Sequence, residues 1–176
     1  MSKTKKMILS ALLLALDIVL SRIISVPIGH IKFSFGFVPL MLAAIWLGPK
    51  YSILIAVLND LIGALLFPVG EFFIGYTITA LLDGAIYGFL LYKKPEEEWS
   101  KMKFALRVIL STLLVSVICN LFLSSLWSYI ITGDAYLLIL SVKLSLEVIR
   151  FPVKIVTILA ITKVLEPITK KYLVEE

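Results

Sequence analysis

A row of charged side chains stands in the last long apolar segment of the chain. Its members are spaced four, three and four residues apart, which places them on one helix face: Lys143, Glu147, Arg150 and Lys154. In a membrane helix each charge costs about 2.5–3.5 kcal/mol, so such residues face a partner or a wet cavity. Two interpretations stay open: a ladder in which Glu147 pairs with Lys143 or Arg150, or a site for an anionic ligand. The surplus of positive charge favours the ligand site. Lys154 can instead serve packing or the cytoplasmic side.

Three more polar residues inside apolar segments are candidates for the same site. Arg22 either extends its charge to the membrane surface or meets a ligand. The carboxylate of Asp60 can accept from the donor edge of a heterocycle or pair with Arg22. Asn120 either bridges two helices or contacts the ligand. Asp83 is flanked by small residues, and we interpret it as a packing or partner residue.

Aromatic residues gather near one end of the expected helices. A belt of aromatic side chains at the membrane surface is the usual reason for such a distribution. As a group near charged residues, they can also stack on a flat ring. The members assigned to the candidate site are Phe35, Phe73, Tyr76 and Trp127.

Composition identifies the solvent in which this chain folds. Apolar residues make up 60% of the 176 positions and charged residues 16%, with a mean hydropathy of +1.03. Soluble domains are about 45–50% apolar and about 25% charged. The sequence therefore predicts an all-α integral membrane protein, with residues 1–176 forming a single membrane domain.

Breaker residues divide the apolar sequence into six expected transmembrane helices, each of which needs about 17–25 residues to span. The second is short because Gly48-Pro49 stops it, and Pro152 predicts a kink in the last. The first is expected to be a retained helix and not a cleaved signal peptide. The expected helices cover residues 5–26, 35–47, 50–67, 72–92, 104–131 and 137–165.

Basic residues set the expected orientation, because cytoplasmic loops are rich in Lys and Arg. With both termini in the cytoplasm, the external loops hold little beyond Lys32. The net charge of +5 then needs no nucleic acid to explain it. The cytoplasmic segments would hold Lys3, Lys5, Lys6, Lys50, Lys93, Lys94, Lys101, Lys103, Arg107, Lys163, Lys170 and Lys171.

The sequence lacks the residues that several kinds of chemistry require. There is no G-x-x-x-x-G-K-[ST] motif, so we expect no ATP hydrolysis by that route. The single histidine, His30, excludes H-E-x-x-H sites, and the single cysteine, Cys119, excludes an intrachain disulfide. We therefore expect no enzyme, no metal and no cofactor. Uphill transport would draw on a partner or an ion gradient.

The first helix carries a pair of small residues one turn apart, Ala11 and Ala15. A small-xxx-small pattern lets another helix approach closely, either within the bundle or from a partner.

The sequence resembles a known family over most of its length. Residues 33–91 resemble the folate-type substrate-binding subunits of energy-coupling factor (ECF) transporters, and the run DLIGALLFP at 60–68 is the most specific part. Arg22, Asn120 with Trp127, and the run KLSLEVIRFP at 143–152 are similar to the family as well.

The resemblance implies a six-helix protein of the bacterial cytoplasmic membrane that captures folate outside with high affinity. It then associates with a transmembrane coupling subunit and two ATPase subunits, with Ala11 and Ala15 against the coupling subunit. Folate has a flat pterin ring and a tail with two carboxylates. Asp60 or Asn120 would meet the ring, Arg22, Lys143 or Arg150 the tail, and the loop from Pro27 to Ser34 would act as a lid.

Two rivals stay open at this point. One is the same architecture with another vitamin or a nucleobase-like compound as ligand. The other is a self-sufficient ion-coupled carrier or channel.

Overall fold

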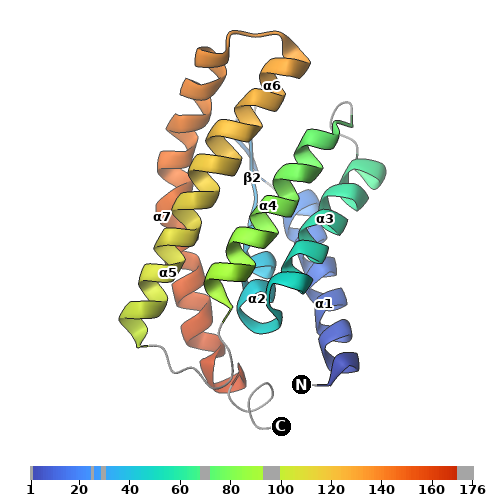
Figure 1. Ribbon diagram of the computed structural model, residues 1–176, viewed down its shortest axis with the longest axis vertical. Coiled ribbons are helices and arrows are strands. Elements are labelled where there is room, and N and C mark those ends of the chain that lie inside the picture. The colour runs from blue at the N-terminus through green and yellow to red at the C-terminus, as the bar shows by residue number, and fades with distance from the viewer. Residues whose placement is uncertain (1, 25, 29–30, 68–71, 93–99, 170–176) are drawn as a thin grey trace.

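The computed structural model describes residues 2–24, 26–28, 31–67, 72–92 and 100–169. Within these ranges the chain forms a helical bundle with one small hairpin (Figure 1). The first helix begins and the last helix ends at the same end of the bundle, the lower end in Figure 1. In chain order the elements are α1 (Lys3–Ile18), η1 (Val19–Ile23), β1 (Val26–Ile28), β2 (Ile31–Phe33), α2 (Phe37–Leu47), α3 (Pro49–Leu66), α4 (Ile74–Leu91), α5 (Lys101–Leu114), η2 (Val115–Leu123), α6 (Ser124–Thr132) and α7 (Tyr136–Thr169).

The helix α1 has one inward face. Ser2 caps it, since its Oγ accepts a hydrogen bond of 3.3 Å from the backbone N–H of Lys5. The buried residues repeat every three or four positions: Ser10, Leu13 and Asp17. The helix then continues into η1, a π-helical segment with one extra residue per hydrogen-bonded turn.

A β-hairpin follows η1 where the sequence predicted only a polar loop. β1 and β2 pair antiparallel, with Val26 opposite Phe33 and Ile28 opposite Ile31. Pairing satisfies backbone groups that a free loop would leave to water. The predicted lid, Pro27 to Ser34, includes residues 29 and 30, which lie outside the described ranges.

The helix α2 is short, and it forms the interior of one half of the bundle. Its 11 residues correspond to about 17 Å, well under the roughly 30 Å of a bilayer core. Figure 1 places it in the lower half, between the other helices. Most of its residues are buried, and Met41, Ala43 and Ala44 have no exposed surface. Above the first residues of α2 there is space that the side chains of the other helices line.

The helices α3 and α4 pack against each other through small residues. Gly84 lies so close to α3 that a Cβ there would be 2.7 Å from the backbone oxygen of Ser52. Ser52 is fully buried, and its Oγ donates a 2.8 Å hydrogen bond to the backbone oxygen of Gly84. Gly88, one turn further along α4, would likewise meet Pro49. Small residues one turn apart allow this close approach.

The second half of the chain consists of two long helical runs joined at the upper end in Figure 1. In the first run, the π-helical segment η2 lies between α5 and α6 with no break in the helix. The turn between α6 and α7 uses Gly133, whose φ of 73° is the left-handed conformation that glycine adopts readily. The final helix, α7, continues through Pro152.

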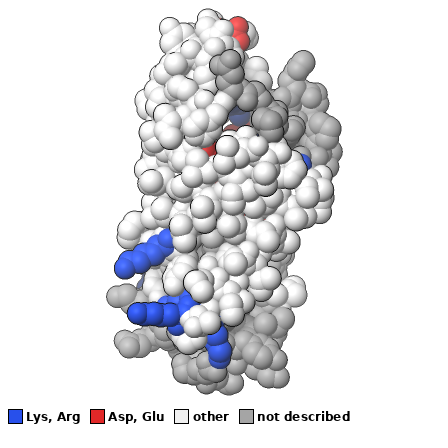
Figure 2. All heavy atoms as spheres, turned by 90° about the vertical axis from the view of Figure 1, so that its right-hand side faces the viewer, with Lys and Arg blue, Asp and Glu red and all other residues white. Residues whose placement is uncertain are grey.

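Much of the surface of the bundle is apolar. Large apolar side chains are widely exposed, and Leu65 and Leu137 are 81% and 76% exposed. On the face shown in Figure 2, Lys and Arg gather toward the lower end. Within the described ranges, three helical stretches are long and apolar enough to cross a membrane: Pro49–Leu66, Ile74–Leu91 and Lys101–Thr132. Of the basic residues predicted in the cytoplasm, Lys93, Lys94, Lys170 and Lys171 lie outside the described ranges.

Candidate functional site

A cavity of about 290 Å³ lies in the middle of the bundle, above the first turn of α2. Ligand pockets commonly measure about 300–1,000 Å³, so this cavity is at the small end of that range. Figure 2 shows a hollow in the upper half of the molecule with acidic and basic atoms inside it. Six segments of the chain line the cavity: Asp17, Ser21, Arg22, Ser34, Gly36, Phe37, Leu40, Ala56, Asn59, Asp60, Ala80, Asp83, Tyr87, Val115, Asn120, Arg150 and Lys154.

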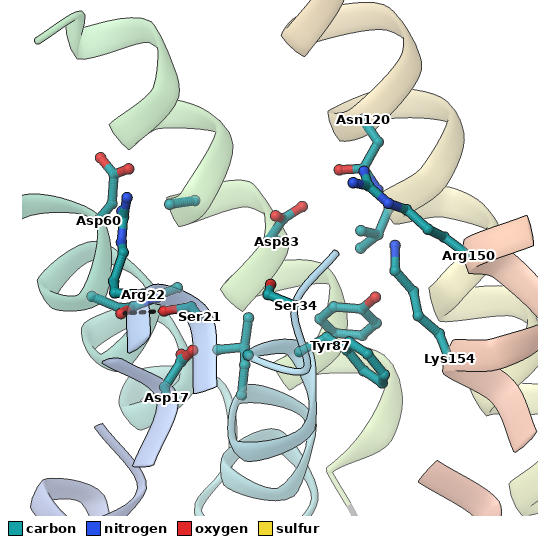
Figure 3. A pocket seen from close by; sticks show the side chains of 17 residues that line it. Asp17, Ser21, Arg22, Ser34, Asp60, Asp83, Tyr87, Asn120, Arg150 and Lys154 are labelled. Atoms are coloured by element: carbon teal, nitrogen blue, oxygen red, sulfur yellow. Dashed lines mark hydrogen bonds between the residues drawn. The ribbon is translucent and has the colours of Figure 1, made fainter. Parts of the chain in front are cut away.

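The lining carries equal numbers of acidic and basic groups. In Figure 3, Arg22 and Asp60 are on one side, Arg150 and Lys154 are on the opposite side, and Asp83 is between them. Charges at this depth are costly unless they meet a partner or a wet space. A cavity that carries cations on two walls and carboxylates among them suits a ligand that has both hydrogen-bond donors and negative groups.

Arg22 reaches the cavity from the π-helical segment η1. Its guanidinium lies against α3 at Gly63, where a Cβ would overlap it. Among the described residues, no acceptor meets the Nε of Arg22, although this atom is buried. A buried donor without an acceptor is uncommon in proteins and calls for an explanation. A bound ligand would provide one.

Two further buried polar atoms of the lining lack a partner among the described residues. They are Oδ1 of Asp83 and the hydroxyl of Tyr87, both on α4. They are four residues apart, so they lie on the same face of that helix. Together with Arg22, the cavity offers unpaired donors and acceptors on two walls.

Asp60 on α3 is held in place by a hydrogen bond from the neighbouring helix α4. Thr77 on α4 donates a 2.7 Å hydrogen bond to its Oδ2. Nearby, Ser21 on η1 and Asn59 on α3 are linked at 3.5 Å, the contact drawn as a dashed line in Figure 3. These bonds join η1, α3 and α4 on one side of the cavity.

Glu147 lies behind the opposite wall and is 5% exposed. Its Oε1 accepts three hydrogen bonds: 2.6 Å from Ser116 Oγ, 3.1 Å from Asn120 Nδ2 and 2.9 Å from Lys154 Nζ. The contact with Lys154 is also an ion pair. The glutamate therefore connects the π-helical segment η2 to α7.

Lys143 has a different environment from the rest of the charged row. Its Nζ donates to the backbone oxygen and the Oγ of Ser124, at 2.6 and 2.7 Å, and to Ser128 Oγ at 2.8 Å. Three acceptors match the three N–H groups of an ammonium. Of the two pairings considered for Glu147, the one with Lys143 is not formed, because Lys143 points toward α6.

The aromatic residues form a cluster between α4 and α6. The rings of Phe73 and Trp127 have centroids 5.6 Å apart, and Phe73 and Tyr76 meet edge to face at 6.3 Å. The indole N–H of Trp127 donates to Thr79 Oγ1 at 3.0 Å, and Tyr76 bonds Ser128 at 3.2 Å. This cluster fixes the upper part of α4 against α6.

Comparison with known proteins identifies the family. The sequence model of the family described as "ECF transporter, substrate-specific component" matches residues 5–168, most of the chain. The chain belongs to this family. It is a family of transporter components, which are membrane proteins, and not of enzymes.

This ECF substrate-specific component is similar to two named relatives and to a solved structure. It is 30% identical to "Folate transporter FolT" of Clostridium novyi (strain NT) over 166 residues, 94% of this chain and 92% of the relative. It is 33% identical to "Folate transporter FolT" of Leuconostoc mesenteroides subsp. mesenteroides over 157 residues, 86% of this chain and 81% of the relative. Among solved structures, "Crystal structure of FolT bound with folic acid" has a TM-score of 0.76 at 35% identity, covering 88% of this chain and 90% of that one.

The structure separates the predicted site residues of this ECF component into two groups. Four of them line the cavity: Arg22, Asp60, Asn120 and Arg150. The others lie beside it. Glu147 bonds Asn120 from behind, Lys143 bonds α6, and Phe35 contacts the lining residue Phe37 with ring centroids 6.1 Å apart. Phe73, Tyr76 and Trp127 form the aromatic cluster described above.

Other lining residues were missed or interpreted differently. Asp83 was interpreted as a packing or partner residue, but it lines the cavity, and its Oδ1 has no partner among the described residues. Its charge inside an apolar run was the available signal. Ser21 and Tyr87 gave no such signal, because a serine or tyrosine in a membrane helix is ordinary. Their place in the site depends on how α4 and the π-helical segment η1 turn.

Proposed function

We propose that this ECF substrate-specific component binds folate in the central cavity and delivers it for ATP-driven import. The observation that carries the proposal is the cavity itself, with cations on two walls and unpaired buried atoms on Arg22, Asp83 and Tyr87. The named relatives and the solved structure with folic acid support the choice of ligand.

The chemistry of folate fits the groups that line the cavity. A pterin ring has N–H and amino donors, which Asp83, Asp60 and the oxygen of Asn120 can accept. The tail carries two carboxylates, which Arg22 and Arg150 can bind with charge-assisted hydrogen bonds. The cavity is at the small end of the range for ligand pockets, so the ring would be enclosed while the tail extends toward the opening.

The proposed topology has six membrane spans with both termini in the cytoplasm of a bacterial cell. Its support is the basic end of the bundle, where α1 begins and α7 ends (Figures 1 and 2). The cavity then opens toward the outside. A protein that captures its ligand outside the cell needs its binding cavity to open on that side.

The proposed partners are a transmembrane coupling subunit and two ATPase subunits. Ala11 and Ala15 are exposed on α1, on the face opposite the buried Leu13 and Asp17. Around them the exposed side chains are apolar, including Leu12 at 63%. A smooth apolar face with small residues suits a close helix–helix contact in lipid.

Binding of folic acid by the purified protein in detergent tests the ligand. Isothermal titration should give tight, stoichiometric binding, and Asp83→Ala should weaken it strongly. Leu137→Ala, which removes an exposed apolar side chain far from the cavity, is the matched control and should bind as the wild type does. Retention of a different vitamin together with no binding of folic acid would overturn the ligand. Substrate accumulation in liposomes by this chain alone would overturn the partner requirement.

A further inference from the structure

We infer that Glu147 is a positioning residue that turns the amide oxygen of Asn120 toward the ligand and holds Lys154 beside it. The pair then presents one acceptor and one donor, which matches the adjacent N–H and C=O groups of a lactam edge in a heterocycle. The choice of folic acid as the probe rests on the proposed function. The orientation of Asn120 does not.

The first step is the direction of the hydrogen bond between Glu147 and Asn120. A carboxylate accepts hydrogen bonds and has none to give, whereas an amide has a donor nitrogen and an acceptor oxygen. The nitrogen of Asn120 therefore faces Glu147 Oε1, at 3.1 Å. The oxygen of the same amide must point elsewhere, and Figure 3 shows it on the cavity side.

The second step is the position of Lys154. Its Nζ donates to the same oxygen, Oε1, at 2.9 Å, and Lys154 also lines the cavity. The two side chains come from different segments, η2 and α7, and the glutamate is the group that they share. Only one of the three N–H groups of Lys154 is used in this bond, so the ammonium can still donate to a ligand.

The third step is that Glu147 acts from behind the wall. It is 5% exposed and is not among the residues that line the cavity. Its effect on a ligand must therefore pass through Asn120 and Lys154. The wall presents an acceptor, the oxygen of Asn120, next to a donor, the ammonium of Lys154. It therefore favours a ring edge with a donor next to an acceptor, as in the N–H and C=O groups of a pterin.

A charge-conserving exchange tests the orientation. Asn120→Asp places two carboxylates together and should lower the affinity for folic acid by about 100-fold or more, since a buried pair loses its bond and gains repulsion. Glu147→Gln should lower it about tenfold.

The double variant N120D/E147Q restores both the hydrogen bond and the net charge, and residue 120 still presents an oxygen to the cavity. Its affinity should return to within about tenfold of the wild type, whereas independent effects would give a loss of about 1,000-fold. Such an additive loss would overturn the inference.

A second ligand separates positioning from simple support of the fold. In the 4-amino analogue of folic acid, the lactam edge is inverted, because the C=O becomes an amino donor and the ring N–H becomes an acceptor. The wild type should prefer folic acid. Glu147→Gln frees the amide to turn, so this preference should narrow by about tenfold. Equal weakening of both ligands would show that Glu147 only supports the fold.

Ser116→Ala is the matched control, because Ser116 bonds the same oxygen at 2.6 Å but does not line the cavity. Both affinities should stay within about threefold of the wild type. Thermal unfolding without ligand completes the design. The double variant should be more stable than N120D whatever the natural ligand is. If the wild type fails to bind folic acid, the proposed function fails, while recovery or its absence in this unfolding series still decides the orientation of Asn120.

Discussion

The guanidinium of Arg22 occupies the space beside Gly63 that any larger residue at that position would fill. This contact places a cation from η1 against α3, one turn from Asp60 and at the edge of the cavity. The glycine is therefore part of the site, although it has no side chain to offer a ligand.

Gly63→Ala should displace the guanidinium without disturbing the helix, because Arg22 is long and can move. We expect the affinity for folic acid to fall about tenfold, as for the loss of one charge-assisted hydrogen bond. Isothermal titration measures this change. In the background of Arg22→Ala the same glycine substitution should have no further effect. An additional loss there would mean that Gly63 acts through another neighbour.

Asp83→Asn should separate ligand binding from stability. In the described residues Oδ1 of Asp83 is buried without a partner, and an amide is less costly to bury than a charged group. The ligand-free protein should melt at the same temperature or a higher one, while folic acid binding weakens at least tenfold because an acceptor is lost. Thermal unfolding and titration of the same sample test both effects. A lower melting temperature with unchanged affinity would assign Asp83 to support of the fold.

Two lysines of α7 provide a matched comparison. Lys154 lines the cavity, whereas Lys143 bonds Ser124 and Ser128 on α6. Lys143→Met should lower the free energy of unfolding by about 1–3 kcal/mol, because it leaves polar atoms of α6 unsatisfied. Its effect on folic acid affinity should be small. Lys154→Met should also lower the free energy of unfolding, because the buried Glu147 loses its ion pair. Unlike Lys143→Met, it should weaken folic acid binding, and more than binding of the 4-amino analogue, because the C=O of the lactam edge loses its donor. Equal losses of affinity in the two variants would place Lys143 in the binding site.

Paired substitutions Ala11→Trp and Ala15→Trp should block transport and spare binding. Both residues are exposed on α1, and a bulky ring there prevents a close helix contact. Folic acid titration on the isolated protein should be unchanged, while uptake by vesicles that contain the complete transporter should be lost. Val148→Trp with Val156→Trp is the control pair. These positions are 67% and 66% exposed on α7, and uptake should survive there.

The helical bundle could be predicted because its cause is compositional. Apolar segments of the right length, bounded by breakers such as Gly48-Pro49, predict membrane helices whatever their neighbours are. The hairpin β1–β2 could not be predicted in the same way. Its residues form two runs of three, too short for a periodic signal, and the pairing depends on where η1 and α2 bring the chain.

The site was harder to predict than the fold, and the reason is the geometry of the helices. A charge in an apolar run indicates that a residue is unusual, but not which way it points. Lys143 and Lys154 share one face of an ideal helix, yet the first meets α6 and the second lines the cavity. The two π-helical segments add to this difficulty. They turn Arg22 and Asn120, and a regular period of 3.6 residues does not predict their directions.

The brevity of α2 determines how cargo can travel. Below the cavity, the described residues form a closely packed layer. Its members without exposed surface are Met41, Ala43 and Ala44 of α2 with Leu91, Val108 and Ile158. Interiors of this kind are packed as densely as organic crystals and do not open without dismantling their contacts. A ligand bound in the cavity therefore has no straight path through this packed layer. Its release on the opposite side of a bilayer would require the cavity itself to move.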